Sequence, residues 1–189
     1  MRLLLICFSV FITFAAAGQK SKKTVPPKYK TAATFAAQKT TDQILHGALI
    51  KAQKENKNIF VIFHASWCGW CHRMDSAMND KTVKPYFDKN FVVKHLVVYE
   101  SEKRKSEETP GALELLTRYA GQDLGIPYWL VFDKTGALIA DSQRKTGENV
   151  GCPASQDEVE YFIEVLKKTS AITPQQIAAV QTRFRKNER

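Results

Sequence analysis

An apolar run followed closely by two cysteines constrains the fold of this 189-residue chain more than any other feature. Residues 59–63 are continuously apolar, which predicts a strand buried on both faces. The sequence Cys68-Gly69-Trp70-Cys71 follows and opens a segment with helical periodicity. In this context Cys68 lies at a helix N-terminus, where unpaired backbone N–H groups and the positive end of the helix dipole favour a thiolate.

The spacing of the two cysteines indicates a reversible dithiol/disulfide centre. Cys68 is predicted to be the nucleophile. Cys71 lies one helical turn later, close enough to attack a mixed disulfide formed on Cys68, and is expected to be more buried. It is therefore predicted to be the resolving cysteine.

The first 17 residues have the pattern of a secretory signal peptide. Met1 and Arg2 precede an apolar run that ends at Phe14, and three alanines up to Ala17 supply the small residues of a cleavage site. The run is shorter than the roughly 20 residues of a spanning helix, so an uncleaved anchor is the weaker alternative. We expect export to the periplasm or the medium, with Cys7 lost on cleavage.

The formal charge of +9 is concentrated at the two ends of the chain. Lysines crowd residues 18–39, a basic segment expected to be flexible, and further cations follow Arg183. No aromatic side chains alternate with these lysines as a stacking platform for nucleic acid would require. We therefore expect solvated tails and no nucleic-acid partner.

Residues 40–170 carry the alternating pattern of a single α/β domain. Thr40 and Gln43 form a capping box that begins the first helix, and the turn at 133–136 predicts a hairpin. The charged run 100–109 is expected to be an exposed connection. This pattern predicts a central mixed sheet flanked by helices, with an extra helix in a C-terminal extension, residues 171–189. The predicted elements are helices at 68–79, 83–88 and 112–120, strands at 58–65, 91–99, 128–132 and 137–140, and helices beginning at Ser155 and Thr173.

Two motifs far apart in the sequence resemble the thioredoxin family. They are the string of residues 63–71 and the sequence Gly125-Ile126-Pro127 at the head of a later strand, and the similarity extends over roughly residues 40–168. The nearest likeness is to secreted bacterial thioredoxin-like disulfide oxidoreductases. The resemblance implies a thioredoxin fold and a cis peptide bond before Pro127, facing the cysteines. It also implies a substrate groove shaped by Trp67, Gly69, Trp70, Ile126 and Pro127.

The chain departs from the family pattern at one position that bears on proton transfer. Thioredoxins carry a buried aspartate six residues before the first cysteine, and here that residue is Ile62. His64 and His72 are the nearest titratable candidates for moving a proton to or from Cys71. Cys152 lies in a loop that, by resemblance, borders the groove, and is a candidate accessory thiol.

These features predict an exported thiol-disulfide oxidoreductase acting on protein disulfides, more as a reductase than as an oxidase or isomerase. Its electrons would come from a donor such as a membrane thiol-disulfide carrier. We expect a monomer without metal or cofactor, since no second cysteine or histidine pair completes a zinc site. Two alternatives remain: a peptide-binding or chaperone-like module with little redox turnover, and attachment of a c-type haem at Cys68-x-x-Cys71-His72.

Overall fold

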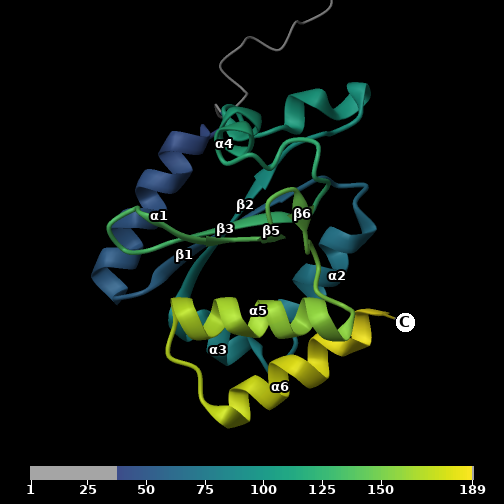
Figure 1. Ribbon diagram of the computed structural model, residues 1–189. Coiled ribbons are helices and arrows are strands. Elements are labelled where there is room, and N and C mark those ends of the chain that lie inside the picture. Colours follow the sequence, from purple (N-terminus) through teal and green to yellow (C-terminus); the bar gives the residue numbers. More distant parts are fainter. Residues whose placement is uncertain (1–37, 189) are drawn as a thin grey trace, which may run out of the picture. The chain divides into compact units, whose positions relative to one another are not determined.

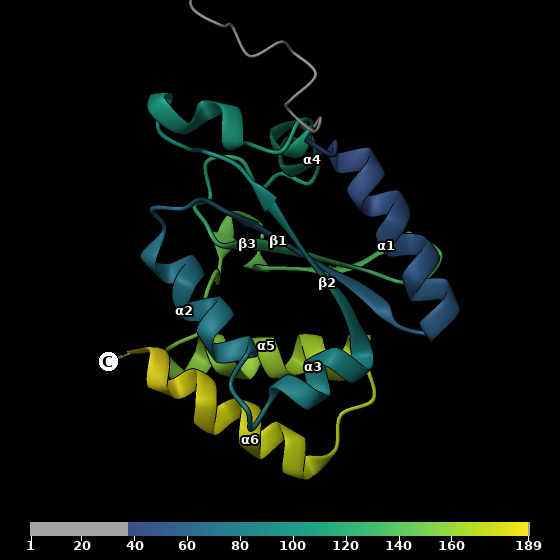
Figure 2. The same cartoon turned by 180° about the vertical axis from the view of Figure 1, so that it is seen from behind.

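The computed structural model describes residues 38–188, whose centre is a four-stranded mixed sheet with helices on both faces (Figures 1 and 2). The predicted signal peptide and nearly all of the basic segment lie outside the described residues. The strand order is β2-β1-β3-β4, with β1 and β2 parallel and the other pairs antiparallel. The strands are β1 (Asn58–His64), β2 (Phe91–Val97), β3 (Tyr128–Phe132) and β4 (Leu138–Asp141).

The helices follow the predicted order, and their capping boxes are confirmed. The side chains of Thr40, Ser155 and Thr173 each accept a hydrogen bond from the backbone N–H of the third helical residue. The side chain of that third residue in turn accepts one from the backbone N–H of the cap residue. None of the helices within residues 38–188 is long and apolar enough to cross a membrane. The helices are α1 (Thr41–Glu55), α2 (Gly69–Met78), α3 (Lys84–Asn90), α4 (Ala112–Arg118), α5 (Gln156–Thr169) and α6 (Pro174–Phe184), with 3₁₀ turns η2 (Glu102–Glu107) and η3 (Arg185–Glu188).

Side chains that alternate along β1 divide the core into two layers. Phe60 and Ile62 pack against α2, α3, α5 and α6, whereas Val61 and Phe63 pack against α1 and α4. All four are at most 1% exposed, so β1 is buried on both faces, as its unbroken apolar sequence predicts. The carboxyl end of this central strand is followed closely by the start of α2, so the buried strand fixes the position of the helix N-terminus.

The C-terminal helix α6 belongs to the core and is not a separate appendage. Val180 and Phe184 are completely buried. The ring of Phe184 lies 4.9 Å from that of Phe162 on α5, centroid to centroid. Packing of this helix against the domain's own surface therefore completes the layer that also holds α2 and α3, as both views show (Figures 1 and 2).

The connections agree with the prediction in part. Residues 101–107 are exposed, as expected for the charged run, but Glu100 and Thr109 at its ends are each 6% exposed, and η2 forms between them. Hydrogen bonds from Ser66 to Glu100, described below, compensate the cost of burying that carboxylate. The sequence also did not predict the small ribbon formed by β5 (Gln143–Lys145) and β6 (Glu148–Asn149), whose polar residues lack strand alternation.

Candidate redox-active site

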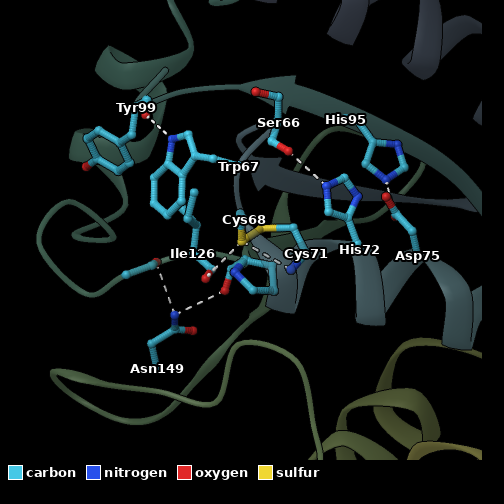
Figure 3. Close-up of a disulfide and its surroundings, with 12 residues drawn as sticks. Ser66, Trp67, Cys68, Cys71, His72, Asp75, His95, Tyr99, Ile126 and Asn149 are labelled. Atoms are coloured by element: carbon cyan, nitrogen blue, oxygen red, sulfur yellow. Dashed lines mark hydrogen bonds and ion pairs between the residues drawn. A yellow bond between two sulfur atoms is a disulfide. The ribbon is translucent and has the colours of Figure 1, made fainter. Parts of the chain in front are cut away.

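The two cysteines are joined in a disulfide at the N-terminus of α2 (Figure 3). Cys68 is the N-cap residue, and its sulfur accepts a hydrogen bond from the backbone N–H of Cys71 at 3.1 Å. Cys68 is 4% exposed and Cys71 is 2% exposed. When the bond is reduced, the same N–H faces the Cys68 sulfur, which is the arrangement that stabilises a thiolate at a helix start.

Two exposed indole rings stand on either side of Cys68. Trp67 is 61% exposed and Trp70 is 48% exposed, although large apolar side chains are usually buried. The Trp67 Nε1 donates to the carbonyl oxygen of Tyr99 at 2.7 Å, and the Arg73 guanidinium lies 4.7 Å from the centre of the Trp70 ring. Both rings are thus held in place by partners of their own, and we call these two exposed rings, which flank Cys68 in the sequence, the indole rim.

The loop 125–127 lies opposite the disulfide, although Pro127 is 56 residues beyond Cys71 in the sequence. The Ile126–Pro127 peptide bond is cis. The Cys68 sulfur lies 3.5 Å from the Ile126 carbonyl oxygen, which is a contact and not a hydrogen bond because a disulfide sulfur carries no proton. Of the five predicted groove residues, Trp70, Ile126 and Pro127 line one pocket, whereas Trp67 and Gly69 lie outside it.

Asn149, at the end of β6, holds this loop and was missed by the sequence analysis. Its side-chain Nδ2 lies 3.1, 3.2 and 3.1 Å from the carbonyl oxygens of Leu124, Gly125 and Pro127. Its Oδ1 accepts the backbone N–H of Gly151 at 3.0 Å. The tripeptide Asn149-Val150-Gly151 indicates a turn, but the local sequence does not reveal that Asn149 binds groups more than 20 residues away.

Replacing Asn149 with alanine is expected to lower the free energy of unfolding by about 1–3 kcal/mol, because it leaves several backbone groups of the loop without a partner. Urea unfolding followed by circular dichroism measures the change. The control is Gln156→Ala on the exposed first turn of α5, which should shift the free energy by less than about 0.5 kcal/mol. An unfolding midpoint for Asn149→Ala equal to the wild-type value would contradict the anchoring role.

A buried carboxylate fixes the residues that precede Cys68. Glu100 accepts hydrogen bonds from the Ser66 backbone N–H at 2.6 Å and from its hydroxyl at 2.8 Å. Arg104 on η2 donates to the same hydroxyl oxygen at 2.8 Å. The Ser66 N–H is the main reason why the pKa of Glu100 is lowered, so the group is ionised at neutral pH. His72 lies 2.9 Å from the Ser66 carbonyl oxygen and ties α2 to this loop.

The two histidine candidates occupy different environments. His72 is exposed, with Nε2 directed at Ser66, whereas His64 is half-buried at the end of β1. Its ring lies 5.2 Å from that of His95, which in turn lies 2.7 Å from Asp75. Burial, followed by the neighbouring His95, lowers the pKa of His64, so this side chain is neutral at pH 7. Its neutral form is a proton acceptor.

Cys152 is close to the groove, but its thiol is in an unreactive environment. It lines the same pocket as Trp70 and Pro127, yet it is only 6% exposed, and the Asn187 side chain donates to its sulfur at 3.3 Å. Burial raises the pKa of the thiol to about 12. At neutral pH it is therefore protonated, which disfavours Cys152 as the candidate accessory thiol.

The match to known proteins is strongest at the level of the family. Residues 40–134 match the model of a family described as thioredoxin-like. The chain belongs to this thioredoxin-like family. It is a thioredoxin-like oxidoreductase with a disulfide between Cys68 and Cys71. No curated protein sequence matches it.

The similar solved structures are distant in sequence. A disulphide isomerase from Xylella fastidiosa is 22% identical, with a TM-score of 0.43, covering 51% of this chain and 69% of that chain. A thioredoxin from Thermus thermophilus is 23% identical, with a TM-score of 0.43, covering 65% and 81%. The C-terminal domain of DsbD from Neisseria meningitidis, in the oxidised form, is 22% identical, with a TM-score of 0.42, covering 70% and 99%.

Proposed function

We propose that the chain is an exported thiol-disulfide oxidoreductase that reduces disulfides in other proteins. The observation that carries the proposal is the placement of the Cys68 sulfur, which accepts a helix N-terminal N–H beside an exposed indole rim and the Ile126 carbonyl. A sulfur in this position is stabilised as a thiolate, and the Ile126 carbonyl beside it is an acceptor for the backbone of an extended substrate segment.

The proposed reaction transfers two electrons in two exchange steps. The Cys68 thiolate attacks one sulfur of the substrate disulfide, that disulfide breaks, and one substrate thiolate leaves. Cys71 then loses its proton and attacks the Cys68 sulfur, the mixed disulfide breaks, and the second substrate thiolate leaves. The substrate gains two electrons, its two thiolates take up one proton released by Cys71 and one from the solvent, and the protein is left with the Cys68–Cys71 disulfide.

The remaining parts of the proposal concern the protein's surroundings. Residues 1–17 would direct export, after which the mature chain would work as a monomer in the periplasm or the medium. An electron donor, such as a membrane thiol-disulfide carrier, would reduce the Cys68–Cys71 disulfide back to the dithiol. The groove lined by Trp70, Ile126 and Pro127 would hold the substrate chain next to the sulfur.

Equilibration with glutathione buffers tests the direction of exchange. We expect a reduction potential near the reducing end of the range of this fold, about −270 mV, and not near about −120 mV, the value of a strong oxidant. The fraction of oxidised protein is read from tryptophan fluorescence, since Trp67 and Trp70 flank Cys68. Cys152→Ser should give the same potential. A value near the oxidising end would contradict the reductase assignment.

A pH profile tests whether His64 accepts the Cys71 proton. Because the pKa of His64 is lowered, the neutral base is already the main form below pH 6.5, and the exchange rate should rise as pH increases through that lowered value. His64→Gln is expected to reduce the rate severalfold and to flatten this rise. His72→Gln is the matched variant and should keep the wild-type profile. An unchanged profile in His64→Gln would remove His64 from the reaction.

A further inference from the structure

A second pocket lies between α2 and the C-terminal segment formed by α6 and η3, and its lining begins at His72, the residue after Cys71. Figure 2 shows these elements side by side, and hydrogen bonds from Arg73 to Asn187 and from Arg183 to Ser76 join them. The lining residues are all polar or charged: His72, Arg73, Ser76, Asp80, Arg183, Lys186 and Asn187. We call this the α2–α6 pocket.

The α2–α6 pocket has an excess of positive charge. Arg73, Arg183 and Lys186 line it, against the single carboxylate of Asp80. Asp80 pairs with Arg183 at 3.1 Å. Within residues 38–188, neither Arg73 nor Lys186 has a carboxylate at ion-pair distance, and Lys186 is exposed. Two cations thus remain for an anionic group from outside the domain.

The arginines of the pocket are fixed in advance by a buried side chain. Asn187 is only 4% exposed. Its backbone oxygen accepts from Arg73 at 2.6 Å, and its side-chain oxygen accepts from Arg183 at 3.1 Å. The Asn187 amide is itself anchored on the Pro153 carbonyl oxygen at 3.0 Å. Holding the guanidinium groups in place reduces the entropy lost when a ligand binds to them.

One stacked pair of side chains links the pocket to the groove. Arg73 stacks on the ring of Trp70, and Trp70 lines the groove together with Ile126 and Pro127. His72 and Arg73 directly follow Cys71 in the sequence. A substrate chain that crosses Trp70 would therefore meet Arg73 first, and a side chain reaching past Arg73 would enter the pocket that Lys186 lines.

We propose that the α2–α6 pocket binds acidic side chains of the protein substrate, close to the disulfide that is exchanged. This inference rests on the proposed function, because it takes the substrate to be a disulfide-bearing protein. The attraction selects substrates by the charge beside their cysteines and leaves the chemistry at Cys68 unchanged.

Peptides with one disulfide and different flanking residues test this selection. The pre-reduced full chain is mixed with a peptide flanked by Glu or with the same peptide flanked by Gln, and its oxidation is followed by tryptophan fluorescence. We expect the Glu peptide to react about fivefold faster at low salt, with the advantage lost at 1 M salt. Lys186→Glu should reduce that rate advantage of the Glu peptide by a factor of about three or more. Equal rates for the two peptides would overturn the proposal.

Lys168→Glu is the matched control, because it makes the same change in charge at a distant exposed site. Lys168 precedes Thr169, whose carbonyl oxygen accepts a hydrogen bond from Asn58 at the start of β1. Because α2 follows the opposite end of β1, Lys168 lies far from the α2–α6 pocket. This variant should keep the wild-type preference for the Glu peptide. A loss equal to that of Lys186→Glu would show that only the total charge matters, and would overturn the pocket as the site.

Two further measurements separate this inference from the proposed function. Reduction of hydroxyethyl disulfide, which is small and uncharged, tests the exchange chemistry alone, and Lys186→Glu should leave its rate unchanged. Titration of the oxidised protein with a Glu peptide whose cysteines are replaced by serine tests binding alone. If that peptide binds no more tightly than its Gln counterpart, the pocket proposal fails, even where exchange is intact. If it binds more tightly while exchange fails, only the proposed function is lost.

Discussion

Cys68→Ser is expected to lower the rate of disulfide exchange by about a thousandfold or more, because it removes the sulfur that we propose as the nucleophile. Neither other cysteine in the described residues can replace it. Cys71 lies within the first turn of α2, whereas Cys68 is the N-cap residue whose sulfur accepts a backbone N–H, and burial raises the pKa of the Cys152 thiol to about 12. The measurement is the rate of insulin-disulfide reduction with dithiothreitol as the donor.

The matched variant Cys71→Ser separates the nucleophile from the resolving residue. It keeps the attacking sulfur, so a mixed disulfide between Cys68 and the substrate should accumulate and be visible by mass spectrometry. Cys152→Ser should exchange at the wild-type rate. Substantial activity in Cys68→Ser, or an adduct mapped to another cysteine in Cys71→Ser, would contradict the assigned roles.

Phe184→Ala is expected to lower the free energy of unfolding by about 3–5 kcal/mol, the usual cost of removing a large aromatic ring from a packed core. The side chain is completely buried. Its ring centre lies 4.9 Å from that of Phe162 and 6.3 Å from that of Phe87. The loss would open a cavity between α6, α5 and α3. Urea unfolding at constant pH gives the magnitude.

Thr182→Ala is the control on the same helix, at an exposed position. It should change the free energy of unfolding by less than about 0.5 kcal/mol. A cost below about 1 kcal/mol for Phe184→Ala would show that the core collapses around the lost ring or that α6 is dispensable. Either outcome would contradict the conclusion that the C-terminal extension is an integral part of the domain.

The parts of the fold that sequence reasoning predicted depend on local chemistry. Capping boxes at Thr40, Ser155 and Thr173 marked three helix starts because the donors and acceptors lie within three residues of each other. The unbroken apolar run marked β1 because a central strand needs apolar residues on both faces. The placement of Cys68 at the start of α2 followed from the same local order.

The parts that sequence reasoning missed depend on partners far apart in the chain. Glu100 belongs to a charged run that looks solvated, and only the fold brings it to Ser66, 34 residues earlier. Asn149 holds carbonyl groups 22 to 25 residues away. The basic α2–α6 pocket joins residues of α2 to η3, more than 100 positions apart. Such pairings leave no periodic pattern, so the sequence shows the residues but not their roles.

Counting thiols by alkylation and mass spectrometry tests the central claim most directly. The intact protein is equilibrated in reducing or oxidising glutathione buffer, alkylated under native conditions and digested. We expect Cys68 and Cys71 to be alkylated together in the reducing buffer and to be protected together in the oxidising buffer, whichever buffer comes first, while Cys152 stays unmodified in both. A disulfide that resists reduction under these conditions, or a Cys68 that pairs with Cys152 in place of Cys71, would contradict it.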